Sequence, residues 1–125
     1  MLVKKITITT EDLKVGASLN DSKTAQNIWD ALPIEGRVNT WGDEIYFSIP
    51  VNVGSENAKA VVSEGDLGYW LPGSAFCIFF GTTPVSRGNE IRAASPVNVF
   101  GKIIGDPKVF KKVSSGAKII IEKDE

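Results

Sequence analysis

Hydrophobic and polar residues alternate with a period of two along most of this chain, and this pattern predicts β-strands. The segment 75–80 (A-F-C-I-F-F) differs because every position is apolar, which is typical of a central strand buried on both faces. The segment 81–88 contains proline, serine and glycine and predicts a long loop. The strands predicted in this way cover residues 2–9, 13–19, 37–41, 44–51, 58–62, 67–70, 75–80, 97–104 and 117–121.

Two other segments predict short helices. The first has apolar residues at i, i+3, i+4 and i+7, with Asp21 and Ser22 as candidate N-caps before it and Pro33 after it. The second begins at Asp106-Pro107, where aspartate caps the helix and proline occupies the first helical position. The apolar positions are Ala25, Ile28, Trp29 and Leu32 in the first helix, and Val109, Phe110 and Val113 in the second.

About eight strands with two short helices predict a mainly β fold. We expect a closed, eight-stranded β-barrel whose open ends are covered by the helices. The length of 125 residues fits a single domain over residues 1–125, and a hydrophobic content of 42% is enough for one core. The chain contains no internal repeat, linker or low-complexity segment.

The composition limits the possible chemistry. The chain contains no histidine, which excludes Ser-His-Asp and Cys-His catalysis and any histidine-ligated metal site. No acidic loop has the pattern of an oxygen-ligand metal site, so we expect neither a metal nor a cofactor. The net charge is −1, which gives no reason to expect nucleic acid as a partner. We expect the most basic region, Lys108, Lys111, Lys112 and Lys118, to be a solvated surface.

The single cysteine, Cys77, excludes an intrachain disulfide and favours a reducing compartment. The N-terminus has no apolar run of signal-peptide length, and the longest apolar stretch is too short to cross a bilayer. We therefore expect a cytoplasmic protein that does not interact with membranes. The oligomeric state is left open.

Several segments resemble cyclophilins in the order in which they occur. The segment 24–29 is similar to the family's K-T-x-E-N-F, and 75–79 is similar to Q-F-F-I. The strongest match is 97–103 followed by 109–113, which resembles H-V-V-F-G-x-V and then V-V-x-x-I. A closer resemblance, to a small prokaryotic family of cyclophilin-like domains without established activity, is carried by 41–47, 64–70 and 72–81. The resemblance implies a cyclophilin-like barrel.

Prolyl isomerisation must overcome a barrier of about 18–20 kcal/mol, and cyclophilins use an apolar slot and an arginine directed at the imide. That arginine belongs to F-H-R-[IV]-I-P, and alignment on the shared Pro50 places Phe47 at its position. The resemblance thus implies a retained barrel without isomerase chemistry. The family's glutamine, slot phenylalanine and histidine correspond to Ala75, Cys77 and Val97. Because the alignment is local, Arg37 or Arg92 remains a candidate substitute for the missing arginine.

Other candidate residues each allow two interpretations. Glu44 and Tyr46 share a strand face beside Trp41 and either grip a cationic or peptide ligand or form an ordinary solvated surface. Cys77 is expected to be an inert small hydrophobe. Arg92 either anchors an anionic group or pairs with Glu90.

We therefore predict a module that binds a peptide or small molecule without catalysis. The alternatives are a divergent prolyl isomerase, an enzyme that acts on a small substrate through Glu44, Tyr46 and Arg92, and a structural module that buries an aromatic face. The predicted groove consists of Trp41, Glu44, Tyr46, Phe47, Phe76, Cys77, Phe79, Arg92 and Val97.

Overall fold

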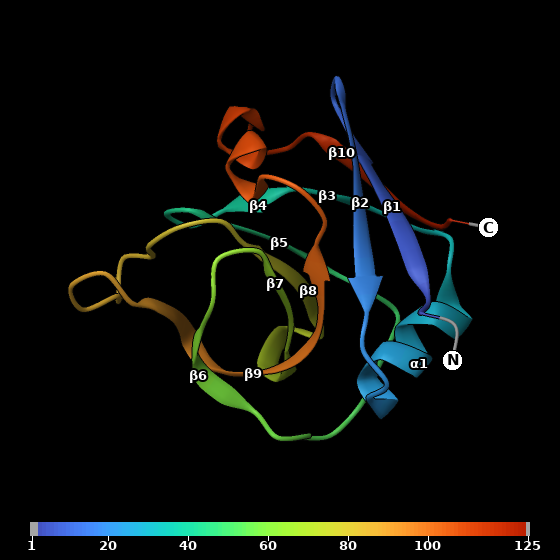
Figure 1. The fold of residues 1–125 in the computed structure, drawn as a ribbon, viewed down its shortest axis with the longest axis horizontal. Coiled ribbons are helices and arrows are strands. Elements are labelled where there is room, and N and C mark those ends of the chain that lie inside the picture. The colour runs from blue at the N-terminus through green and yellow to red at the C-terminus, as the bar shows by residue number, and fades with distance from the viewer. Residues whose placement is uncertain (1–2, 125) are drawn as a thin grey trace.

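The computed structural model describes residues 3–124, and β-strands are its main secondary structure (Figure 1). The strands are β1 (Lys5–Thr10), β2 (Leu13–Leu19), β3 (Ile34–Arg37), β4 (Asn39–Thr40), β5 (Glu44–Ser48), β6 (Lys59–Val62), β7 (Asp66–Trp70), β8 (Ala75–Phe79), β9 (Ile91–Ile103) and β10 (Lys118–Lys123). They join into one sheet with the order β3-β10-β1-β2-β9-β7-β8-β5-β4, and β6 pairs with β9 beside this path.

The prediction of a closed, eight-stranded barrel is wrong, because the sheet has ten strands and is not closed. The predicted strand 37–41 is divided at Val38: the part before it pairs with β10, and the part after it pairs with β5. Val38 itself exchanges hydrogen bonds with Ala117 and Gly116, at 2.8 and 2.7 Å. The first and last strands in this order, β3 and β4, are therefore consecutive in the sequence. The sheet coils round on itself, and its hydrogen-bonded ladder ends at Val38.

The mainly β character and the two helices are confirmed. Helix α1 (Lys23–Ala31) begins at the N-cap Ser22, whose side chain accepts a hydrogen bond from the Ala25 N–H, and it ends before the extended Leu32. The second helix is a 3₁₀ helix, η2 (Pro107–Lys112), capped by Asp106. A one-turn 3₁₀ helix, η1 (Leu71–Gly73), was not predicted. Within residues 3–124, no helix has the length and apolar character needed to span a membrane.

The main core lies inside the coiled sheet and is built around three phenylalanines. The ring of Phe76 stacks on Phe47 at 5.1 Å between centroids and meets Phe100 edge-on at 5.0 Å. All three side chains are buried, as are the neighbouring isoleucines of β1 and β10. Offset-stacked and edge-on pairs are the favourable arrangements of aromatic rings, so this trio joins β5, β8 and β9.

A second, smaller apolar cluster lies on the other face of β8. Strand residues alternate between faces, so Phe76 and Ile78 enter the main core while Ala75, Cys77 and Phe79 face outward. All five are buried, which confirms the prediction that this strand is covered on both sides. The outer cluster also contains Val62, Ile91, Ala93 and Val97, contributed by β6 and β9.

Close contact between β2 and β9 gives the first prediction. A β-carbon on Gly101 would overlap the backbone oxygen of Ser18 on the paired strand, whereas one on Gly16 would meet nothing closer than 3.9 Å, at Ile104. We expect Gly101→Ala to lower the free energy of unfolding by about 2 kcal/mol because a strand must move. Gly16→Ala is the control and should be neutral or slightly stabilising. Urea denaturation of both variants measures the difference, and equal midpoints would contradict the close contact.

Candidate functional site

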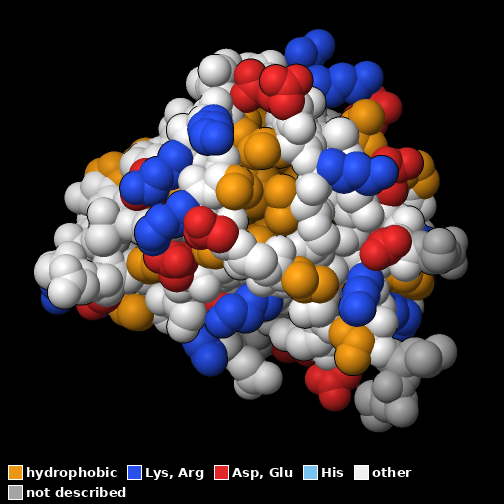
Figure 2. All heavy atoms as spheres, turned by 45° about the horizontal axis from the view of Figure 1, so that its top comes forward, with side chains coloured by type: hydrophobic (Ala, Val, Ile, Leu, Met, Phe, Trp, Pro, Cys, Tyr) orange, Lys and Arg blue, Asp and Glu red, His pale blue; other side chains and the backbone are white. Residues whose placement is uncertain are grey.

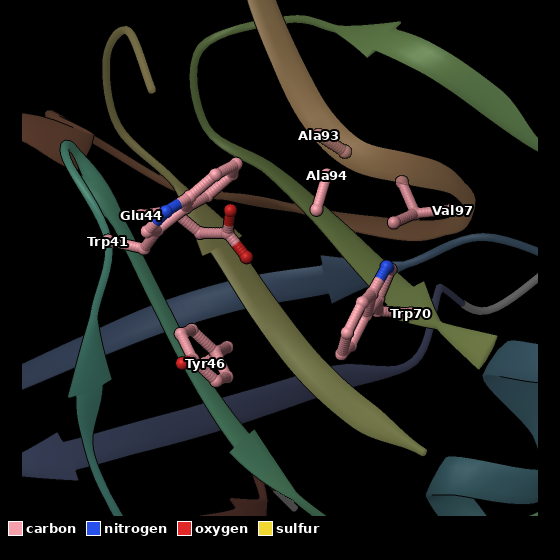
Figure 3. A pocket seen from close by; sticks show the side chains of 7 residues that line it. All are labelled: Trp41, Glu44, Tyr46, Trp70, Ala93, Ala94 and Val97. Carbon is pink, nitrogen blue, oxygen red and sulfur yellow. The ribbon is translucent and has the colours of Figure 1, made fainter. Parts of the chain in front are cut away.

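A pocket of about 280 Å³ lies at the outer apolar cluster (Figure 3). Its walls come from the β4–β5 turn, β5, the end of β7 and β9. Figure 3 shows Trp41, Glu44 and Tyr46 on one side and Trp70 across from them, with the carboxylate of Glu44 pointing into the space between. The lining residues are Trp41, Glu44, Tyr46, Trp70, Ala93, Ala94 and Val97.

Strand register places the side chains of this pocket on the same face. Residues that pair across antiparallel strands share a face of the sheet. On β5, Glu44 pairs with Phe79 of β8 and Tyr46 pairs with Cys77. On the other side of β8, Trp70 pairs with Ala75. Three outward-facing residues of β8 therefore form an apolar layer beneath the lining residues.

Hydrogen bonds fix the two tryptophans that border the pocket. The backbone N–H of Trp41 donates to the carbonyl of Glu44 at 2.9 Å across the turn between β4 and β5. This turn needs the positive φ of Gly42, at 60°. The indole N–H of Trp70 donates to the hydroxyl of Ser95 at 2.7 Å. Because the second bond orients the indole, Trp70 is held in place before any ligand arrives.

Glu44 carries the unusual electrostatics of the pocket. Its side chain is 6% exposed, and Oε1 is the one buried side-chain polar atom within residues 3–124 that has no hydrogen-bond partner. Burial raises the pKa of this carboxyl from 4.5 to about 7, while the neighbouring Cys77 thiol acts in the opposite direction. The interpretation of Glu44 as a solvated surface charge is therefore wrong. A carboxyl without a partner at this position is costly to the fold.

The thiol beneath Glu44 is withdrawn from solvent. Cys77 is 1% exposed and donates a long hydrogen bond of 3.9 Å to the carbonyl of Ala75. Burial, and then the neighbouring charge of Glu44, raise the pKa of the thiol well above its ordinary value. The neutral thiol is a poor nucleophile, so the surroundings of Cys77 favour packing over reaction.

The structure brings together only part of the predicted groove. Trp41, Glu44, Tyr46 and Val97 line the pocket. Cys77 and Phe79 lie in the layer beneath it, whereas Phe47 and Phe76 point into the main core. Alignment on Pro50 therefore chose a residue on the wrong face of β5, and Tyr46 is the neighbour that faces the pocket.

Neither candidate arginine lines the pocket. The Nε of Arg92 lies 2.6 Å from a carboxylate oxygen of Glu90, which is the ion pair considered as an alternative. Arg37 lies on β3 and donates to the carbonyl of Gly116 at 3.3 Å. The polar group that this pocket presents is thus a carboxyl, and none of its seven lining residues carries a guanidinium.

Sequence reasoning missed Trp70, Ala93 and Ala94. Trp70 and Tyr69 lie on opposite faces of β7, and Tyr69 is buried and donates to the carbonyl of Val51. The order of strands in the sheet determines that Trp70, and not Tyr69, faces the pocket. Ala93 and Ala94 belong to the first half of β9, which was not predicted as a strand because Pro96 interrupts it.

Three lysines of the basic region form surface ion pairs. Lys108 pairs with Glu64, Lys111 with Asp43 at 3.6 Å, and Lys118 with Glu35 at 3.5 Å. Figure 2 shows basic and acidic side chains interspersed around an apolar patch on one face of the molecule. No group of three or more potential metal ligands was found in the described part of the chain.

Two comparisons with known proteins give matches. The family model described as cyclophilin-like matches residues 4–122. The solution structure of the hypothetical protein AF2241 from Archaeoglobus fulgidus is similar, with 41% sequence identity and a TM-score of 0.82. The similarity covers 97% of this chain and 95% of that chain. A search of curated proteins gave no match.

The buried carboxyl makes stability depend on pH. Folding raises the pKa of Glu44 from 4.5 to about 7, so the stabilising contribution is fully present below pH 4.5 and is lost as the pH rises through about 7. We expect the free energy of unfolding to fall by about 3 kcal/mol over this window relative to Glu44→Gln, which does not ionise.

Urea denaturation of the wild type and of Glu44→Gln at a series of pH values measures this difference. The matched control is Glu35→Gln, which removes an equal charge from an exposed ion pair with Lys118 and should follow the wild-type profile. Parallel profiles for wild type and Glu44→Gln would show that the carboxyl is not buried in solution.

Proposed function

This chain belongs to the cyclophilin-like family, and we propose that it uses its outer pocket to bind a small molecule or a single protruding side chain of a peptide, without prolyl isomerase activity. The observation that carries the proposal is the unpartnered, buried oxygen of Glu44 at the edge of an aromatic pocket. Buried polar groups are normally hydrogen-bonded, and an exception inside a pocket suggests that a ligand supplies the partner.

The size and lining of the pocket support a small ligand. A volume of about 280 Å³ lies just below the usual range for small-molecule sites, about 300–1,000 Å³, and suits a ligand of only a few heavy atoms. Three aromatic side chains offer apolar contact, and the hydrogen bond between Trp70 and Ser95 holds one of them in place. A preformed wall costs less ordering on binding, so a small ligand gains more net affinity there.

The polarity of the pocket argues against isomerase activity. Cyclophilins are expected to direct the donor groups of an arginine at the imide, and a guanidinium has donors only. Here Arg92 is occupied by Glu90, and Arg37 lies on β3. The polar group at this position is instead the carboxyl of Glu44, which accepts hydrogen bonds when ionised.

A second candidate, an enzyme acting on a small substrate, is favoured by one observation. A carboxyl with a pKa of about 7 is suited to proton transfer near neutral pH. In that case Glu44 would act as the base or acid, with Tyr46 beside it. Arg92 takes no part in this version, because it does not line the pocket.

Isomerase activity is tested by exchange spectroscopy on a proline tetrapeptide. We expect the rate of cis–trans exchange with the protein to equal the uncatalysed rate, because no guanidinium is among the lining residues of the pocket. Robust acceleration that is lost on Arg92→Ala or Arg37→Ala would contradict the proposal. Acceleration that survives both changes would require a different catalytic group and would also contradict it.

Ligand binding is tested by filling the pocket. Ala94 is exposed and lines the opening, so Ala94→Phe should occupy the space while leaving the core intact. In a fragment screen followed by the indole NMR signals, we expect binders to shift Trp41 and Trp70 in the wild type and not in this variant. Ile104→Phe places a ring on the exposed Ile104, which does not line the pocket, and should retain binding. Binders that are unaffected by Ala94→Phe would place the site elsewhere.

A further inference from the structure

The pocket combines aromatic walls with one hydrogen-bond acceptor that lacks a donor. Trp41, Tyr46 and Trp70 border the space, and Oε1 of Glu44 is buried beside them. We propose that the pocket recognises an alkylammonium group that retains at least one N–H, which donates to the carboxylate of Glu44 while the alkyl part lies among the aromatic side chains. This inference rests on the proposed function and names the chemical class of the ligand.

A cation satisfies both features of the pocket. The faces of tryptophan and tyrosine attract cations, and this attraction strengthens when water is excluded. An ionised carboxylate in a site of low dielectric constant gains more from a positive partner than it would in water. The chain supplies no such partner, since Arg92 is paired with Glu90 and Lys111 with Asp43. Burial and the neighbouring Cys77 thiol account for the pKa of Glu44, and no neighbouring cation contributes among the described residues.

The chain uses the same attraction elsewhere, with its own lysines. The Nζ atoms of Lys123 and Lys4 lie 4.9 and 5.8 Å from the ring centre of Trp29. Within residues 3–124, no lysine or arginine takes such a position over Trp41 or Trp70. The two tryptophans of the pocket are therefore open to a cation from outside, and Trp29 provides an internal reference.

The single unpartnered oxygen distinguishes among cations. An ammonium is a compact charge that satisfies one acceptor with one N–H, whereas a guanidinium prefers the two oxygens of a carboxylate in a fork. A quaternary ammonium has no N–H, and Oε1 would remain without a partner beside it. A metal ion would need several protein ligands, and the described residues contain no such group. A primary, secondary or tertiary amine fits best.

The ionisation of Glu44 links this recognition to pH. The chain has no histidine. The ionisable or charged groups on the elements around the pocket include Cys77 on β8, Tyr46 on β5, Lys59 on β6, which pairs with Val97, the Asp43–Lys111 pair at the turn and the Glu90–Arg92 pair where β9 begins. The hydrogen bond between Glu90 and Arg92 lowers the pKa of the acid and raises that of the base, which keeps this pair ionised. An ammonium requires the carboxylate form of Glu44, whereas a neutral ligand that accepts a hydrogen bond requires the protonated form.

The experiment compares butylammonium with its neutral counterpart, butan-1-ol, by following the indole NMR signals of the full-length protein. We expect butylammonium to shift Trp41 and Trp70, to leave Trp29 unchanged, and to bind about tenfold or more tightly than the alcohol at pH 8. With the pKa of Glu44 at about 7, affinity for the amine should fall about tenfold between pH 8 and pH 6.

Variants and related probes separate the possible causes. Glu44→Gln should remove both the preference for the amine and its pH dependence, while Glu35→Gln, which removes an equal charge from the surface, should retain both. Butyltrimethylammonium should bind less tightly than butylammonium because it offers no N–H. Two further probes are a short peptide with one internal lysine and the same peptide with dimethyl-lysine. They test whether the pocket binds the amine of a side chain or that of a free molecule. Binding of either a peptide amine or a free amine supports the inference.

Three results would overturn the inference. First, the alcohol could bind as tightly as the amine. Second, the affinity for the amine could rise as the pH falls toward 6. In both cases the pocket would bind ligands without recognising an ammonium, and the proposed function would stand. Alternatively, no amine could shift the two indoles. If the fragment screen also finds no ligand that Ala94→Phe blocks, the proposed function fails together with the inference.

Discussion

The architecture depends on one short strand that is buried on both faces. On its inner side β8 places Phe76 between Phe47 and Phe100, and on its outer side it presents Ala75, Cys77 and Phe79. Because successive side chains point in opposite directions, neither set can be changed in register without exposing the other. The same constraint fixes the neighbours: β5 and β7 pair with β8 on its two sides and deliver Glu44, Tyr46 and Trp70 to the outer face.

The outer face contains a buried carboxyl, whose desolvation destabilises the fold, and the inner core carries no such cost. A side chain with the volume of Glu44 and no charge would avoid the desolvation that raises the pKa of this carboxyl to about 7. The cost falls on the one described buried side-chain oxygen without a partner, and this oxygen borders a pocket. Unfavourable interactions of this kind persist where a site needs them and are removed elsewhere. The location of the cost is therefore a stronger indication of function than the fold is, since one fold supports many functions.

Sequence patterns predicted most of the fold because the signals were local. The cap at Ser22, the Asp106-Pro107 start and the alternation along β5 each depend on neighbours in the chain. The resemblance to cyclophilin-like domains is confirmed by the family match over residues 4–122. The prediction of a closed sheet was wrong because the hydrogen-bonded ladder ends at Val38, between β3 and β4, and nothing in the local sequence marks this residue. The pocket depends on which face of each strand meets which neighbour, so the predicted groove included both Tyr46, which faces the pocket, and Phe47, which faces the core.

The pocket of this chain differs from the site of a cyclophilin isomerase in the direction of its hydrogen bonds to a ligand. The resemblance implies that a cyclophilin directs an arginine at the substrate imide. The arginine only donates hydrogen bonds, and the imide accepts them. In this chain the outer face of the sheet presents a carboxyl instead, and its ionised form only accepts. A substrate with an imide carbonyl would bring a second acceptor to Oε1, and two acceptors without a proton between them repel each other. Complementarity therefore requires a donor from the ligand whenever Glu44 is ionised. The pocket thus combines apolar walls with a polar requirement opposite to that of an arginine-based site, and this reversal is the ground on which we propose a binding function without isomerase activity.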